Sequence, residues 1–314
     1  MVVLGRVLLA VAGASLAYLL AAVALDPRAA LADRSPRPPP AAVDARLGEL
    51  GLSGSLPRRY VMWAEGVSRG DFGETLSGAP VGGELWRRAG ASLRLVLAGF
   101  VLGTAGGVLL GSLGALSRYG WADRLLTVGT LTLLSVPVFA VAVLLQTAAL
   151  WANARSGLRL FEWTGEYTPG TPDGPLGRLR HLLLPTVTLA LGQLAVCARY
   201  QRGVMLDVLG AGYVRTAMAK GLRRRQALWR HGLRVAVLPM PTFASYSFAG
   251  LLTGAAITEK AFAWHGLGEW LIDSIYADDV NAVAACGCAV AAATATAGLL
   301  AGLSRAALDP RARS

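Results

Sequence analysis

Six long apolar runs constrain the fold of this chain more than any other feature of its sequence. They lie at about residues 1–25, 93–116, 125–150, 182–198, 235–257 and 280–303. Each approaches or exceeds the length of about twenty residues that a helix needs to cross the hydrocarbon core of a bilayer. The composition agrees, because 54% of the 314 residues are hydrophobic and only 16% are charged. We therefore expect an all-α, polytopic membrane protein with about six transmembrane helices.

The first run also has the outline of a secretory signal peptide, because the basic residue Arg6 precedes an apolar core. Its apolar part is longer than that of a usual signal peptide, and further apolar runs follow it. We therefore expect residues 1–25 to be retained as the first transmembrane helix. An extracytoplasmic segment at 26–92 and a transmembrane domain at 93–314 should follow.

Charged residues indicate the orientation of the chain in the membrane. Residues 202–234 contain eight Lys or Arg against the single acid Asp207, an excess that is typical of a cytoplasmic loop. Residues 26–84 carry basic and acidic side chains in nearly equal numbers, which suits the outer side. Six spans then place both termini in the cytoplasm. The net charge of +11 does not indicate nucleic-acid binding, because the basic residues cluster at the ends of apolar runs rather than on one continuous face.

The outer segment predicts a small folded element. It begins with Ser-Pro-Arg-Pro-Pro-Pro at 35–40, a stiff connector of the polyproline type. Residues 41–50 are then rich in helix formers, with Val43, Leu47 and Leu50 on one helical face. We expect a small helical cap on the outer face of the membrane.

No pattern in the sequence indicates catalysis or a resident cofactor. Cys286 and Cys288 lie in an apolar stretch without a nearby His or acidic residue, whereas a structural zinc site usually has four ligands. The chain has no phosphate loop, and no motif of a catalytic nucleophile has a supporting context. An intramembrane enzyme would need catalytic residues within the spans, and no span has a His or an Asp in its central part. We therefore expect no catalytic residue, no metal and no cofactor on this chain.

The most distinctive local motif is Tyr-Val-Arg-Thr-Ala-Met-Ala-Lys-Gly-Leu at residues 213–222, directly followed by three arginines at 223–225. Ala217 and Ala219 keep a short helix narrow, and Gly221 permits a left-handed helix end that other residues resist. On a basic loop between two apolar runs, this pattern predicts a short cytoplasmic helix that docks on a partner. An ordinary basic loop without a docking role is the alternative.

This segment and several others resemble the inner-membrane permease subunits of peptide-importing ABC transporters, the dipeptide and oligopeptide permease family, and within it the B-type oligopeptide subunits. The resemblance covers about residues 60–313. Its other motifs are Gly-Asp-Phe-Gly at 70–73, Ser-Val-Pro-Val-Phe at 135–139, Ala-Arg-Tyr-Gln-Arg at 198–202, Gly-Ala-Ala-Ile-Thr-Glu-Lys-Ala-Phe at 254–262 and Leu-Asp-Pro-Arg at 308–311. Three positions depart from the family pattern, because Gly212 replaces a usual acid, Met218 a commonly basic residue and Val235 a frequent Asn.

The resemblance implies a permease subunit of an importer that translocates oligopeptides across a bacterial cytoplasmic (inner) membrane. Its implied partners are a second homologous permease subunit, two cytoplasmic ATPase subunits, which would bind ATP and magnesium, and an extracytoplasmic peptide-binding protein. The implied residues of the coupling helix are Tyr213, Val214, Arg215, Thr216, Ala217, Met218, Ala219, Lys220, Gly221 and Leu222. A permease for nickel or another small solute is an alternative within the family. A channel or ion-coupled carrier that works without nucleotide is an alternative outside it.

Polar side chains within the spans and a proline in the third span suggest a translocation path, because polar groups are costly against lipid. The candidates are Ser135, Pro137, Phe139, Gln193, Thr253 and Glu259. A Ser or Thr can instead bond to the backbone of its own helix. Pro137 should kink the third span. Glycines from Gly99 onward crowd the second span and favour close packing, either within this chain or with a second permease subunit.

Overall fold

The computed structural model of the chain describes residues 2–167 and 174–308, and most of the terminal Leu-Asp-Pro-Arg motif lies outside them. The described residues are almost entirely helical and contain no β-sheet. Five helices are long and apolar enough to cross a membrane, and a bent pair, Arg224–Ala236 with Met240–Ala261, makes a sixth if it is one span. The expected fold class, an all-α polytopic membrane protein, is confirmed.

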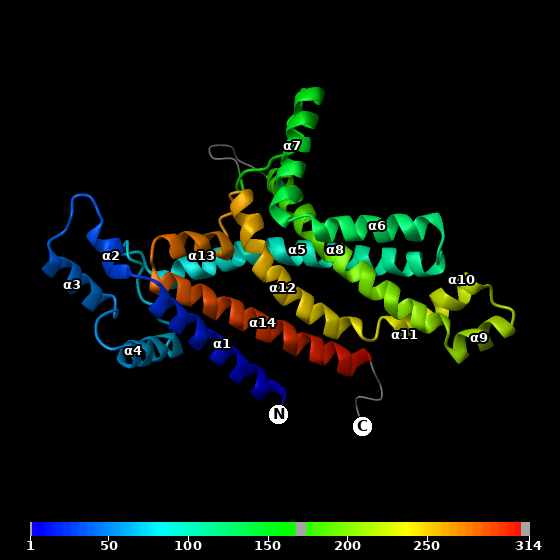
Figure 1. Cartoon of the computed structure of the whole chain (residues 1–314), viewed down its shortest axis with the longest axis horizontal. Helices are drawn as coiled ribbons and strands as arrows, with labels where there is room; N and C mark the ends of the chain where they lie inside the picture. Colours follow the sequence, from blue (N-terminus) through cyan, green and yellow to red (C-terminus); the bar gives the residue numbers. More distant parts are fainter. Residues whose placement is uncertain (1, 168–173, 309–314) are drawn as a thin grey trace. The chain divides into compact units, whose positions relative to one another are not determined.

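Figure 1 shows the helices in chain order. They are α1 Val2–Ala24, α2 Pro27–Ala32, α3 Pro40–Glu49, α4 Leu56–Ser68, α5 Val81–Leu116, α6 Trp121–Ser135, α7 Val138–Ser156, α8 Pro175–Leu209, α9 Gly212–Ala219, α10 Arg224–Ala227, α11 Leu233–Ala236, α12 Met240–Ala261, α13 Leu267–Tyr276 and α14 Val280–Leu308, with one π-helical turn, Leu228–Gly232, between α10 and α11.

The chain divides into two compact units, which are described separately. The first contains Met1–Leu93 and His265–Thr296, and the second contains Arg94–Trp264 with the rest of the C-terminal helix. Helices α5 and α14 each contribute to both units.

The first unit contains the expected helical cap. Helix α3 coincides almost completely with the helix predicted at 41–50, and its apolar face, Val43 and Leu47 together with Leu50, is buried. These side chains pack with Tyr18 of α1 in one core, where Tyr18 also stacks on Trp63 of α4 with ring centroids 4.5 Å apart. The cap is therefore anchored on the first transmembrane helix by buried apolar and aromatic area.

The structure adds a helix that we did not predict from the sequence. Helix α13, between α12 and α14, buries Trp270 against Val81 and Leu85 of α5 and against the first turns of α14. The backbone N–H of Leu267 at its start donates to Ser92 Oγ at 2.7 Å. Residues 258–279 contain six charged side chains, so the segment was not among the apolar runs that we expected to span a membrane.

In the second unit, the single kinked helix expected at 125–150 is instead two helices. Helix α6 ends at Ser135, Val136 and Pro137 are extended, and α7 starts at Val138. A proline cannot donate a backbone hydrogen bond and disfavours helical geometry in the residue before it, so the expected kink becomes a full break. Figure 1 shows α7 running in a different direction from α6.

The glycines of the second span pack within this chain. Gly99, Gly103, Gly107 and Gly111, four residues apart, face α8 so closely that a Cβ atom on any of them would lie within 2.4 to 2.8 Å of an α8 atom. Helix α8 itself passes through Pro185 without a break and is much longer than the apolar run at 182–198. These two helices therefore form a tightly packed pair.

Candidate functional site

The predicted docking segment forms helix α9, and one face of this helix is buried in the chain itself. Val214 is fully buried and Ala217 is 9% exposed, and Met218 and Leu222 pack against the same core. This core includes Ala115, Met205, Val208, Ala227, Leu228 and Ala236. Ala217, one of the two alanines that we expected to keep the docking helix narrow, therefore does not lie on the face open to a partner.

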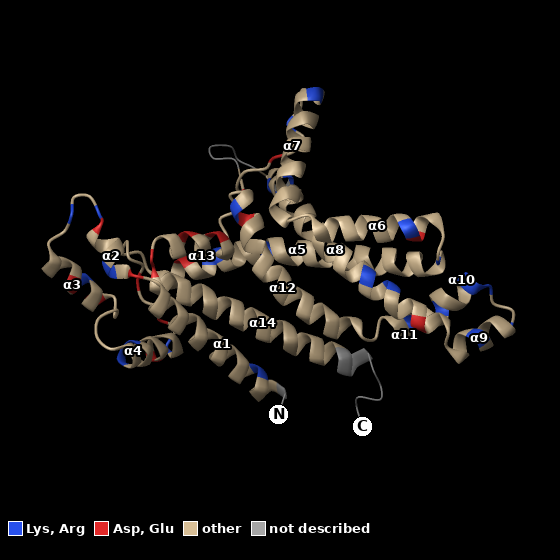
Figure 2. Cartoon of the chain, viewed as in Figure 1, with Lys and Arg blue, Asp and Glu red and all other residues tan. Residues whose placement is uncertain are grey.

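The opposite face of α9 is open. Tyr213 is 44% exposed, and Arg215, Thr216, Ala219 and Lys220 are exposed as well. The arginines at 223–225 that follow are also exposed, and Figure 2 shows basic residues gathered around α9, α10 and α11. The open face of α9 therefore presents aromatic, small and basic side chains. Such a face is complementary to an acidic surface on a partner protein.

The C-terminus of α9 is capped by backbone geometry. The N–H of Gly221 donates to the carbonyl of Met218 at 2.9 Å, and the N–H of Leu222 donates to the carbonyl of Ala217 at 3.3 Å. This pair of bonds is the Schellman motif, which ends a helix through a residue in a left-handed conformation. Gly221 has a φ of +94°, so the positive φ predicted from the sequence is confirmed.

An ion pair links α8 to the start of α6. Arg202 Nε and Nη2 donate to the two carboxylate oxygens of Asp123 at 2.6 and 2.7 Å, and the Tyr119 N–H donates to the same carboxylate at 3.0 Å. The side chains of Asp123 and Arg202 are 4% and 27% exposed. Hydrogen bonding from Arg202 holds the pKa of Asp123 below its usual value. A nearly buried, bidentate contact thereby joins α8 to α6.

A cavity of about 400 Å³ lies beside the break between α6 and α7. Its walls come from α6, α7, α8 and α12, and Val136, Val138, Gly192, Gln193 and Ser247 contribute to them. Gln193 Nε2 donates to Thr104 Oγ1 of α5 at 3.1 Å and to Ser247 Oγ of α12 at 3.0 Å. One amide thus ties three helices together at the edge of the cavity.

The other predicted path residues are not at the cavity wall. Ser135 and Thr253 donate to carbonyls of their own helices, at 2.9 and 3.2 Å, and are exposed. Phe139 and Pro137 are exposed beside the helix break. Glu259 is almost completely buried near the end of α12, where its backbone carbonyl accepts from the Trp264 N–H at 2.8 Å. Among the six candidates, the structure therefore places only Gln193 in the wall of this cavity.

Several residues of these sites were not singled out from the sequence. Asp123 had a recognisable signal, because it is a lone acid between Arg118 and Arg124 in a short basic loop. Thr104 had none, because a threonine on a glycine-rich span is also typical of plain helix packing. Within the described part of the chain, no group of three or more His, Cys, Asp or Glu residues is placed to hold a metal ion.

The fold places the chain among polytopic helical membrane proteins, and sequence comparisons define its family. Residues 107–314 match the model of the family described as the binding-protein-dependent transport system inner membrane component. The chain is 50% identical over 311 residues to the oligopeptide transport system permease protein OppB of Mycobacterium tuberculosis, covering 98% of this chain and 95% of the relative. It is 33% identical over 260 residues to the dipeptide transport system permease protein DppB of Escherichia coli K12, covering 76% and 75%. A putative peptide permease protein of Brucella ovis is 32% identical over 280 residues, covering 86% and 84%.

The chain therefore belongs to the family of binding-protein-dependent transport system inner membrane components. It is a multi-pass permease subunit of an ABC transporter and a transport component rather than an enzyme.

Proposed function

We propose that the chain is a permease subunit of an importer for oligopeptides in a bacterial cytoplasmic membrane. The observation that carries this proposal is the 50% identity, over nearly the whole chain, to a permease named for oligopeptide transport. Under this proposal, a second homologous permease subunit completes the membrane pathway. A peptide-binding protein delivers substrate from outside, and two cytoplasmic ATPase subunits bind ATP and magnesium.

Helix α9 is the proposed contact with an ATPase subunit. Its open face carries Tyr213, Thr216, Ala219 and Lys220, and its buried face holds it firmly on α8. A short helix fixed on one side and exposed on the other suits the transmission of force from a partner. The basic residues around it favour acidic groups on that partner and keep the loop on the cytoplasmic side.

Movement of α9 has a continuous route to the cavity. Helix α9 is packed on the end of α8, α8 is locked to α5 by the glycine contacts, and Arg202 joins α8 to α6 through Asp123. Helix α6 then ends at the break beside the cavity. ATP-driven displacement of α9 would therefore rotate α8 and α6 together and change the opening between α6, α7 and α12.

The cavity is the proposed portion of the translocation path that this subunit contributes. Its wall is mostly apolar, with Thr188, Gln193 and Ser247 as polar groups. A wall without fixed charges and with few hydrogen-bonding groups suits a path for substrates of varied sequence, because tight binding would slow release.

The test is transport by the assembled complex in vesicles. Vesicles that contain the chain, the second permease subunit, the ATPase subunits and the peptide-binding protein should take up a labelled oligopeptide only when ATP is present. The ATPase subunits should copurify with the chain. Uptake of a labelled peptide without ATP, or purification of the chain without any ATPase subunit, would contradict the proposal.

A further inference from the structure

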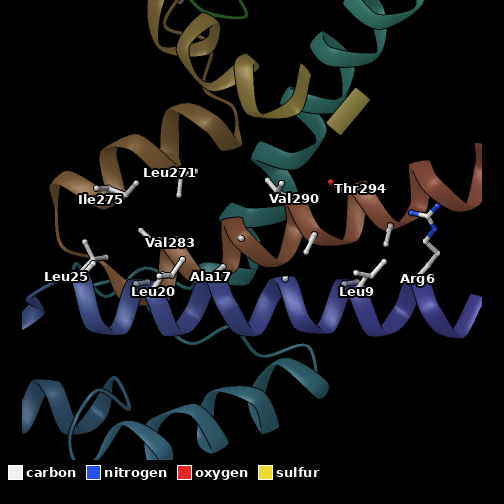
Figure 3. Close-up of a pocket in the computed structure, with 17 residues that line it drawn as sticks. Arg6, Leu9, Ala17, Leu20, Leu25, Leu271, Ile275, Val283, Val290 and Thr294 are labelled. Atoms are coloured by element: carbon white, nitrogen blue, oxygen red, sulfur yellow. The ribbon is translucent and has the colours of Figure 1, made fainter. Parts of the chain in front are cut away.

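A large apolar groove lies between α1, α13 and α14 of the first unit (Figure 3), with a volume of about 670 Å³. Helix α1 lines it from Arg6 to Ala24 and Leu25 follows directly, α13 contributes Leu271 and Ile275, and α14 forms the opposite wall. Figure 3 shows Leu9 and Leu20 of α1 directed toward α14. The nineteen residues of α1 from Arg6 to Ala24 extend over about 28 Å, close to the thickness of a bilayer's hydrocarbon core.

The groove is a fixed feature of the packing rather than a gap beside a loose helix. Helix α1 touches α14 at Ala17 and Gly287, where a Cβ atom on the glycine would lie 2.3 Å from that of Ala17. On its other side, α1 is held by a 2.8 Å hydrogen bond between Ser15 Oγ and Tyr60 OH. The two contacts set the distance and angle at which α1 crosses α14.

The groove has a charged residue at one end, and the rest of its lining is almost entirely apolar. Its lining is hydrocarbon except for Arg6 at one end and Thr294. Arg6 is half-buried and makes no ion pair or hydrogen bond with any other residue in the described ranges 2–167 and 174–308. A guanidinium at the end of an apolar groove favours an anion at that end, because its aliphatic stem can lie along the apolar wall while its head stays at the membrane surface.

We propose that this groove binds an acyl chain of an anionic phospholipid whose phosphate lies against Arg6. If each carbon takes about 30 Å³, the volume of one water molecule in the liquid, an acyl chain of sixteen carbons needs about 480 Å³. It therefore fits the groove, whose volume is about 670 Å³. A peptide would leave its backbone groups without hydrogen-bond partners there. With the N-terminus in the cytoplasm, as the charge pattern of the sequence predicts, the lipid belongs to the inner leaflet.

The experiment measures lipids retained by the intact transporter. The complex is extracted from membranes that contain equal amounts of phosphatidylglycerol and phosphatidylethanolamine, and retained lipid per chain is quantified by mass spectrometry. The wild type should retain phosphatidylglycerol in excess. Arg6→Gln should lower that excess about fivefold, which corresponds to the roughly 1 kcal/mol of one basic residue at an anionic surface. Val290→Phe, which fills the groove, should lower retention of both lipids.

Matched controls separate the groove from general effects. Arg124→Gln removes an exposed basic residue outside the groove, and Leu8→Phe adds bulk to an exposed position on α1 that does not line it. Both should retain lipid as the wild type does. The proposal is overturned if the wild type shows no excess of phosphatidylglycerol, or if Arg6→Gln behaves like Arg124→Gln. It is also overturned if a cysteine at position 9 cross-links in membranes to the second permease subunit, because a protein then covers the groove.

Discussion

Gly221 is the residue whose backbone most restricts substitution in the α9 loop. Its φ of +94° lies in a region that side chains with a Cβ adopt only at a cost of about 1 to 2 kcal/mol. An added Cβ would meet no atom within 4 Å, so the cost comes from the backbone alone and not from a clash. Gly221→Val should therefore shift the end of α9 and uncouple ATP hydrolysis from peptide uptake while the subunit still inserts into the membrane.

The measurement for this variant is the ratio of peptide uptake to ATP hydrolysis in reconstituted vesicles. Gly210→Ala is the matched control, because Gly210 ends α8 in the same loop with an ordinary φ of −81°. The control should keep the wild-type ratio. A wild-type ratio in Gly221→Val would mean that the end of α9 does not transmit the signal.

The pair formed by Asp123 and Arg202 should behave as a coupled unit. Arg202→Met leaves a carboxylate that is 4% exposed without its cation, whereas Asp123→Asn leaves the more exposed guanidinium unpaired. The first variant should therefore destabilise the subunit more, by about 1 to 3 kcal/mol, and the double variant should recover part of the loss. Thermal unfolding of the four proteins checks this; additive losses would show that the pair is not coupled.

The pH dependence of this pair follows from the lowered pKa of Asp123. A carboxylate whose pKa is depressed on folding contributes its full stabilisation when the pH is above the pKa that it has in the unfolded chain, about 4. That contribution to stability is lost as the pH falls through the lower pKa that Asp123 has in the folded protein. The stability difference between the wild type and the double variant should therefore be constant from about pH 5 to pH 8.

At the scale of helices, α9 has two faces that substitutions can separate. Ala219→Glu places a negative charge on the exposed face and should weaken association with the ATPase subunit, leaving the fold of the permease unchanged. Ala217→Glu instead places a charge in the core beneath α9, where it should cost several kcal/mol and destabilise the loop. Copurification of the ATPase and thermal unfolding of the permease distinguish the two effects. Loss of stability in both variants to the same extent would contradict the assignment of the faces.

The sequence predicts a helix or its end well where neighbouring residues determine it, and poorly where packing against distant parts of the chain does. The helix at 41–50 follows from the spacing of Val43, Leu47 and Leu50, and the cap at Gly221 follows from one residue type. The inward position of Ala217 could not be predicted, because alanine suits a buried face and a narrow exposed face equally. The full break at Pro137 also exceeds what the sequence specifies, since proline permits either a kink or an end.

At the scale of the whole molecule, the sequence predicts how the chain is oriented in the membrane. The excess of basic residues around α9 predicts that this loop lies in the cytoplasm and that the cap lies outside. In a variant without the native cysteines, a cysteine at Ser53 in the cap should react with an impermeant maleimide added to intact spheroplasts. A cysteine at Thr216 should react only after the membrane is opened. Both positions are exposed, so failure to react cannot be ascribed to burial within this chain. Labelling of Thr216→Cys, but not Ser53→Cys, from outside would reverse the orientation. It would also remove α9 from reach of a cytoplasmic ATPase and assign the phosphate at Arg6 to the outer leaflet.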